Sequence, residues 1–181
     1  MERCAWATTD LMKKYHDEEW GKPLHDDQAL FELLILETMQ AGLSWSTILN
    51  KRENYRKVLD GFDPNQIIHY DQNKMEELLS NPGIIRNKLK ISSIIKNATA
   101  FLKVQEEYGS FDRYIWSFVG GEPIVNHFNS FEELPAKTEL SIVLAKDMKK
   151  RGFSFVGPVT CYAFMEAAGL VNDHSDHCFF K

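Results

Sequence analysis

The sequence predicts an all-α fold, on three observations. Of the 181 residues, 44% are hydrophobic and 26% are charged, which is typical of a globular domain with its own core. Apolar residues recur at helical spacing along several stretches, and capping residues and glycines delimit these stretches. No stretch alternates with period two for long enough to indicate a sheet.

The first predicted helix covers about residues 28–40. Asp26 and Asp27 can cap its start, and its sequence ALFELLILETMQ is apolar nearly all round, so we expect a central, buried helix. Gly42 breaks it, and Ser44 can cap the next one. Similar signals predict the remaining elements in order: helices over about 45–59, a short one after Asp71, 84–109 and 111–119, a loop over 120–135, and helices over 138–151 and 158–168.

Bulk properties exclude several classes of protein. No apolar run approaches the roughly 18 residues that a membrane span needs, and the segment MERCAWATTD lacks the regions of a signal peptide. We therefore expect a cytoplasmic protein with no membrane partner. Three cysteines, Cys4, Cys161 and Cys178, are an odd number in a reducing compartment, which favours metal binding or burial over a disulfide.

The net charge of −5 argues mildly against a nucleic-acid partner, but the charge is uneven. Basic residues gather in two segments, Lys146, Lys149, Lys150 and Arg151, and Arg86, Lys88 and Lys90. Each cluster is either a solvated helix face or a phosphate-binding surface, and its position relative to other motifs must decide.

Residues 146–168 predict two helices joined by a tight hairpin. Gly152 and Gly157 bound the connection, which contains Phe155, and the second helix starts with proline. The free amides of such a helix start bind phosphate, and Lys150 and Arg151 lie where they could hold flanking phosphates. A plain helical corner with an apolar plug is the alternative, and the pattern alone leaves both open.

Two candidate metal half-sites lie near the two termini. Cys4 and His16 are close to the N-terminus, and His174 and Cys178, four apart as on one helical turn, are close to the C-terminus. Two sulfurs and two nitrogens suit a structural Zn²⁺ ion with no open position. Because more than 150 residues separate the halves, spacing alone favours unrelated thiols and surface histidines.

Glu37 is a carboxylate inside the apolar helix. The helix offers no lysine or arginine three or four residues away, so another segment or a ligand must satisfy the charge. This predicts a functional site at Glu37; a water-filled helix edge is the alternative. Trp6, Trp20 and Trp45 fall in the first quarter of the chain, and of these Trp6 is interpreted first as a core residue.

Several motifs together resemble bacterial 3-methyladenine DNA glycosylase I, a family of the helix–hairpin–helix DNA glycosylase superfamily. They occur in order from Met1 to about Cys178: ERCAW, YHDEEWG, QAGLSW, RGFSFVGP and LVNDH. The resemblance implies a single glycosylase domain over 1–181, made of two helical subdomains. It also implies that zinc-binding termini, 1–25 and 170–181, pack together, with Cys4, His16, His174 and Cys178 as the ligands. The sequence does not fix the oligomeric state, and we expect a monomer.

The resemblance also implies a base pocket and a chemistry. Glu37, Tyr15 and Trp45 would line the pocket, with Trp20 and Trp6 beside them. The substrate would be double-stranded DNA containing 3-methyladenine, a cationic base that is flipped out of the helix and leaves without protonation as free 3-methyladenine. Stacking on Trp45 would hold the base, worth about 1–3 kcal/mol.

DNA contacts follow from the same resemblance. Gly42 and Leu43 would fill the gap that the flipped base leaves, and the hairpin residues Lys150, Arg151, Gly152, Phe155 and Gly157 would hold the backbone. Val159 occupies the position of the Schiff-base lysine of bifunctional relatives, so no strand-cleaving lyase activity is expected. Two other readings stay open: a non-catalytic hairpin module, which leaves Glu37 and Trp45 unexplained, and a zinc hydrolase, which needs an open metal position.

Overall fold

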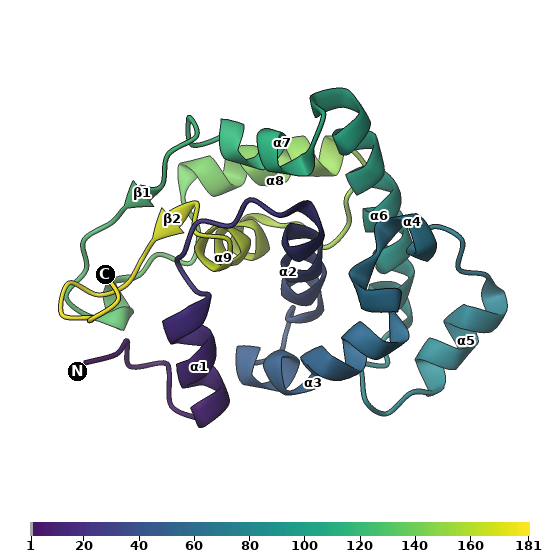
Figure 1. Ribbon diagram of the computed structural model, residues 1–181, viewed down its shortest axis with the longest axis horizontal. Coiled ribbons are helices and arrows are strands. Elements are labelled where there is room, and N and C mark those ends of the chain that lie inside the picture. The colour runs from purple at the N-terminus through teal and green to yellow at the C-terminus, as the bar shows by residue number, and fades with distance from the viewer. Residues whose placement is uncertain (1) are drawn as a thin grey trace.

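The computed structural model describes residues 2–181 and is mostly helical (Figure 1). Its elements, in order, are α1 (Asp10–Glu18), α2 (Asp27–Met39), α3 (Trp45–Val58), η1 (Asp60–Phe62), α4 (Pro64–Ile67), α5 (Gln72–Ser80), α6 (Lys88–Tyr108), α7 (Phe111–Ser117), β1 (Ile124–Val125), η2 (Phe131–Glu133), α8 (Glu139–Lys150), α9 (Pro158–Ala167) and β2 (Val171–Asn172).

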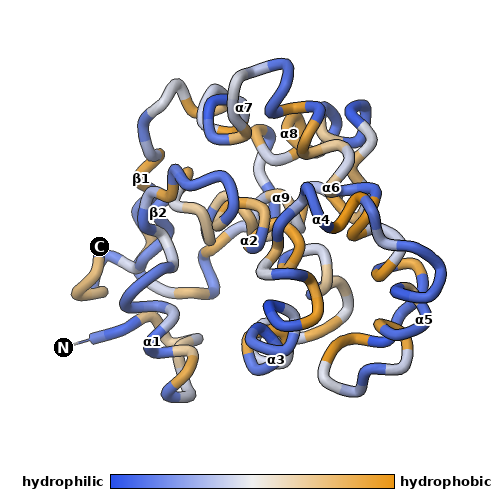
Figure 2. Tube along the Cα trace, turned by 45° about the vertical axis from the view of Figure 1, so that its right-hand side comes forward, coloured by the Kyte–Doolittle hydropathy of each residue, from blue (hydrophilic) through white to orange (hydrophobic). Residues whose placement is uncertain are grey.

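Helix α2 runs through the middle of the molecule, as its composition predicts (Figure 1). The side chain of Asp26 accepts a hydrogen bond from the amide of Ala29, and every residue from Leu33 to Met39 is buried. Neighbours cover α2 on several sides, namely α3, α6, α7 and α9. Figure 2 shows hydrophobic residues concentrated along α2 and α9 in the interior. The apolar pattern thus places Glu37 inside the fold.

The structure corrects the sequence prediction at three places. Helix α1, capped by Thr9, lies in a segment for which no helix was predicted. Helix α6 begins at Lys88, capped by Asn87, and not at Ile84. Finally, the predicted loop after Gly120 contains η2 and strand β1, which pairs in parallel with β2 (Ile124 with Val171, Val125 with Asn172). This pair is too short to produce a period-two pattern.

Apolar packing divides into one large core and a smaller aromatic cluster. The large core joins α2, α6, α7, α8 and α9. The smaller cluster contains Cys4, Tyr15, Trp20, Leu49 and Cys178, so it brings both ends of the chain together. Figure 1 shows the N and C ends on the same side of the molecule. The division into two subdomains stays a prediction.

Within residues 2–181, no helix has both the length and the hydropathy that crossing a bilayer requires.

Candidate functional site

A cavity of about 190 Å³ lies between α1, α2, α3 and α9. All five predicted pocket residues line it: Trp6, Tyr15, Trp20, Glu37 and Trp45. Its remaining walls are residues that the sequence analysis did not single out: Met12, Gln40, Phe131, Ala163 and Glu166. Trp6 is therefore a wall of the pocket, although sequence reasoning treated it first as core.

Three of the wall residues lie near the ends of helices. Tyr15 lies in the last turns of α1, Glu37 in the last turn of α2, and Trp45 is the first residue of α3. The bend at Gly42 turns α3 back, so that the rings of Tyr15 and Trp45 lie 5.2 Å apart. Three helix ends thus converge on one small volume.

Four buried polar atoms in this pocket have no hydrogen-bond partner among residues 2–181. They are Trp6 Nε1, Tyr15 Oη, Glu37 Oε2 and Trp45 Nε1, and no other buried side-chain nitrogen or oxygen in this part of the chain is unpaired. Leaving a buried polar group unpaired costs about 1–3 kcal/mol. Four such groups around one cavity, two donors, one acceptor and one hydroxyl, indicate a site built for a polar ligand.

Burial changes the acid–base behaviour of the pocket. It raises the pKa of Glu37, which is 4% exposed, to about 8. It also raises the pKa of Tyr15 well above its usual range, with the nearby carboxylate of Glu37 adding to the effect. Both shifts disfavour negative charge in the pocket, and an entering cation would oppose them.

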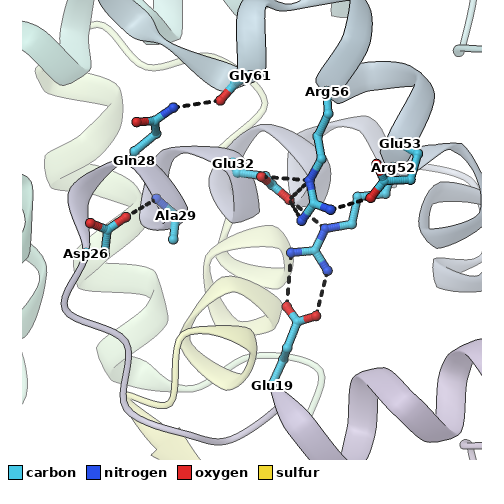
Figure 3. Close-up of polar contacts among 9 residues, drawn as sticks. All are labelled: Glu19, Asp26, Gln28, Ala29, Glu32, Arg52, Glu53, Arg56 and Gly61. Carbon is cyan, nitrogen blue, oxygen red and sulfur yellow. Dashed lines mark hydrogen bonds and ion pairs between the residues drawn. The ribbon is translucent and has the colours of Figure 1, made fainter.

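An ion-pair network behind the pocket joins the helices that form it (Figure 3). Arg52 on α3 donates two hydrogen bonds to Glu19, at the end of α1, over 2.9 and 3.0 Å. It donates a third, over 2.5 Å, to Glu32 on α2, which also accepts from Arg56 over 2.7 Å. The side chains of Arg52 and Glu32 are each only 12% exposed, which strengthens the pairing. This network fixes α1, α2 and α3 relative to one another.

A second cavity of about 220 Å³ adjoins the first at the bend between α2 and α3. Gly42 and Leu43, predicted to fill the DNA gap, line it together with Glu37 and Val159. Leu43 is 39% exposed, and Gly42 has a φ of +77°, which favours glycine.

Lys90 on α6 closes the end of α2. Its buried ammonium group donates to the carbonyl oxygens of Met39 and Ala41 over 2.8 and 2.6 Å. Sequence reasoning placed Lys90 in a basic cluster and missed this role.

The predicted hairpin is present between α8 and α9. Asn97 on α6 holds it by bonds with both backbone groups of Ser154, over 2.7 and 3.1 Å. Phe155 has a φ of +58° and is 37% exposed, so the hairpin presents an apolar tip. A Cβ atom built on Gly152 or Gly157 would meet nothing within 4 Å, so both glycines leave the backbone open to a large partner.

The basic residues beside the hairpin differ in their surroundings. Lys150 is exposed. Arg151 is only partly exposed, because its guanidinium donates to Asp147 and Glu107, each over 2.7 Å, and lies over the ring of Tyr108. The structure gives Arg151 intramolecular partners; its predicted phosphate contact stays a prediction.

The two half-sites of the sequence converge into one buried cluster. The ligand atoms of Cys4, His16, His174 and Cys178 all lie within 4.8 Å of one another. Cys178 Sγ is 3.5 Å from His16 Nε2 and 3.4 Å from His174 Nδ1. Bonds of about 2.0–2.3 Å to a tetrahedral metal require ligand separations of about 3.3–3.8 Å. The four-residue spacing of His174 and Cys178 suggested that both lie on one helical turn. They lie instead in the non-helical segment after β2.

Surrounding groups orient both histidines for a metal. His16 Nδ1 lies 2.8 Å from a carboxylate oxygen of Asp17, and His174 Nε2 lies 2.9 Å from the carbonyl oxygen of Trp20. Each outer nitrogen can therefore donate a proton, leaving the inner nitrogen free to bind. Burial lowers the pKa of His174 to about 4 and raises that of Cys4 to about 11, so it favours the uncharged form of both side chains. The residues of the cluster can hold a metal ion.

This combination of a mostly helical fold, a glycine-bounded hairpin and an enclosed aromatic pocket defines a helix–hairpin–helix protein with a small-molecule site. A family model described as methyladenine glycosylase matches residues 6–181. The chain belongs to this family. It is 47% identical to DNA-3-methyladenine glycosylase 1 of Escherichia coli, over 98% of this chain and 96% of that protein. It is 46% identical to the DNA-3-methyladenine glycosylase of Haemophilus influenzae, over 97% and 96% of the two.

Solved structures agree with this assignment. The crystal structure of a 3-methyladenine DNA glycosylase I superposes with a TM-score of 0.96, at 49% identity and with 98% of each chain covered. A Tyr-to-Phe variant of such an enzyme, in complex with 3-methyladenine, also gives a TM-score of 0.96, at 37% identity, with 100% of this chain and 98% of the other covered. The family resemblance found in the sequence is thereby confirmed.

Proposed function

We propose that the protein hydrolyses the N-glycosidic bond of 3-methyladenine in double-stranded DNA, releasing the free base and leaving an abasic site for base-excision repair. The observation that carries this proposal is the set of unpaired polar atoms on the pocket walls. Glu37 accepts a hydrogen bond from the exocyclic amine, and Trp45 stacks on the ring. The relatives named for this activity support the same substrate.

Charge explains why such a pocket suffices. Methylation at N3 makes adenine a cation, so the base leaves the sugar as a neutral molecule and needs no general acid. Glu37 and the aromatic rings stabilise the flipped cation. The chain then needs to exclude solvent from the base while water attacks the sugar carbon.

DNA binds, in this proposal, along the hairpin and the α2–α3 bend, with the protein acting as a monomer. The open backbone at Gly152 and Gly157 and the exposed Lys150 receive the phosphates. Leu43 and Gly42 fill the gap in the duplex. Val159, 56% exposed at the start of α9, offers no amine for a Schiff base, so the strand stays intact.

The metal cluster is assigned to one structural zinc ion. Two thiolates and two neutral imidazoles form a tetrahedral set that zinc prefers. When bound, the ion would join the segment around Cys4 to the segment around Cys178. Its positive charge would balance the negative charge of the two buried thiolates. It has no part in hydrolysis, since four protein ligands leave no position for water.

One experiment tests the activity directly. The protein is incubated with methylated duplex DNA, and released bases are identified by chromatography. We expect free 3-methyladenine, with strand breaks only after alkali. Glu37→Gln and Trp45→Ala should reduce release while keeping the wild-type circular dichroism spectrum. No free base from the wild-type protein would refute the proposal, and strand cleavage without alkali would refute the absence of lyase activity.

A further inference from the structure

We propose that Glu166 is a second acidic residue of the base pocket and makes the pocket select positively charged bases over neutral ones. This inference rests on the proposed function and adds a specificity-determining residue to it.

Glu166 lies on α9, one residue before the helix ends, and it faces two cavities. It lines the base pocket together with Glu37. It also lines an adjoining cavity of about 300 Å³ with Phe131, Pro135 and Val159. Glu166 thus lies at the boundary between the base pocket and the neighbouring cavity.

Hydrogen bonds hold the backbone of Glu166 in place, whereas its carboxylate has no bonding partner within the described residues. Its carbonyl oxygen accepts hydrogen bonds from the amides of Gly21, over 2.9 Å, and Gly169, over 3.3 Å. The half-buried carboxylate makes no hydrogen bond or ion pair with any side chain or backbone group in residues 2–181. Because it lines the pocket and has no partner within the protein, this carboxylate is available to a ligand in the pocket.

The charges around Glu166 are negative. Those of Asp173, after β2, and Glu37, on α2, act on it, and Glu37 shares the pocket with it; Tyr15 on α1 and Tyr162 on α9 are the uncharged titratable neighbours. Burial first, then these two carboxylates, raise the pKa of Glu166 well above its usual range. The pocket therefore holds two acidic groups that cannot both ionise easily while no cation lies between them.

A cationic base changes this balance. It attracts both carboxylates, so its entry favours loss of a proton from the pair. A neutral base gives no such gain and leaves the repulsion in place. Glu37 provides hydrogen bonding to either base, whereas Glu166 contributes only where the ligand carries charge.

The test compares two ligands that differ in one methyl group and in charge. The 3,9-dimethyladeninium ion is a cation at pH 8, whereas 3-methyladenine is uncharged at that pH. Dissociation constants are measured by quenching of tryptophan fluorescence, because Trp6, Trp20 and Trp45 line the pocket. In Glu166→Gln we expect the constant for the cation to rise about tenfold and that for the neutral base to change less than about twofold.

Control variants separate charge from packing. Glu106→Gln removes one exposed charge on α6 and should leave both constants unchanged. Glu166→Asp should retain the cation preference. An equal loss for both ligands in Glu166→Gln would assign a packing role, and no loss for either would remove Glu166 from recognition; both outcomes overturn the inference.

A second measurement leaves residue 166 unaltered. In Glu37→Gln, calorimetry in two buffers of different ionisation enthalpy should still detect proton release when the cation binds. No release would overturn the inference. If the wild-type protein releases 3-methyladenine from DNA while these tests fail, only the role of Glu166 is lost; if it binds neither ligand and releases no base, the proposed function fails as well.

Discussion

At the scale of single residues, the pocket depends on polar groups that the protein itself does not satisfy. Glu37 is buried by the same apolar face that makes α2 the central helix, so its cost is a direct result of the fold. The neighbouring orphan atoms on Tyr15 and the two indoles share that cost. These unpaired groups lower the stability of the folded protein. A ligand that forms hydrogen bonds with them removes this penalty, which increases its affinity.

Glu37→Gln should therefore change stability in a pH-dependent way. With a pKa near 8 when folded and about 4.5 when unfolded, Glu37 destabilises the folded state progressively as pH rises from 4.5 to 8. Well below pH 4.5 the carboxyl group is neutral in both states and has no such effect. We expect the free energy of unfolding of the variant, relative to wild type, to increase by on the order of 3–5 kcal/mol between pH 4.5 and 9. Urea titrations across this range measure it; a pH-independent difference would contradict the assignment.

Sequence reasoning found the residues whose type conflicts with their surroundings and missed those whose role comes from distant segments. Glu37 stood out because an acid interrupts an apolar helix. Glu166, on α9, did not, since its raised pKa depends on α2 and on the segment after β2. The pairing of Arg151 did have a local signal, because Asp147 precedes it by four residues.

At the scale of elements, the site is a meeting of helix ends. Capping residues and glycine predicted where α2 ends and α3 begins, and the structure confirms both within a residue. Helix α1 escaped prediction because it is short and mostly polar, and its stability depends on packing and on Arg52. Tyr15 reaches the pocket only through this docking.

Arg52→Met tests whether the docking of α1 depends on Arg52. The substitution removes the bonds to Glu19 and Glu32; Glu19 then has no ion-pair partner, whereas Glu32 keeps only its pairing with Arg56. We expect a loss of about 2–4 kcal/mol in the free energy of unfolding, together with weaker binding of 3-methyladenine. Urea denaturation and fluorescence titration measure the two effects. As a matched control, Arg113→Met on α7 should affect neither; wild-type affinity in Arg52→Met would show that α1 docks without the network.

At the scale of the whole molecule, the two ends of the chain form one structure. Residues separated by 170 positions, Cys4 and His174, come within 3.7 Å. The spacing of these residues could not predict their contact, because the number of residues between two side chains does not show whether they meet in the fold. The family resemblance supplied that prediction. The loop over residues 20–24 also helps to bring the two ends together, because it crosses the chain closely at Gly169. A Cβ atom on Gly169 would lie 2.2 Å from the backbone of Lys22, so only glycine allows this approach.

Removing the metal should loosen the ends of the chain without abolishing base release. For Cys178→Ser we expect the zinc content, by atomic emission, to fall from one ion per chain to none. Loss of a structural metal worth about 3 kcal/mol would lower the melting temperature by roughly 6–12 °C. Wild-type protein treated briefly with a chelator should still release 3-methyladenine. Complete inactivation by that treatment would instead support a hydrolytic role, and metal-free native protein would end the zinc assignment.

The ammonium group of Lys90 has an electrostatic consequence at the surface that would face DNA. The carbonyl end of any helix carries partial negative charge, which repels phosphate. By binding the carbonyl oxygens of Met39, the last residue of α2, and of Ala41 just beyond the helix, Lys90 compensates this charge. The α2–α3 bend can thus approach a polyanion although no basic side chain projects from it, and a protein with a net charge of −5 needs fewer exposed cations to accept its substrate.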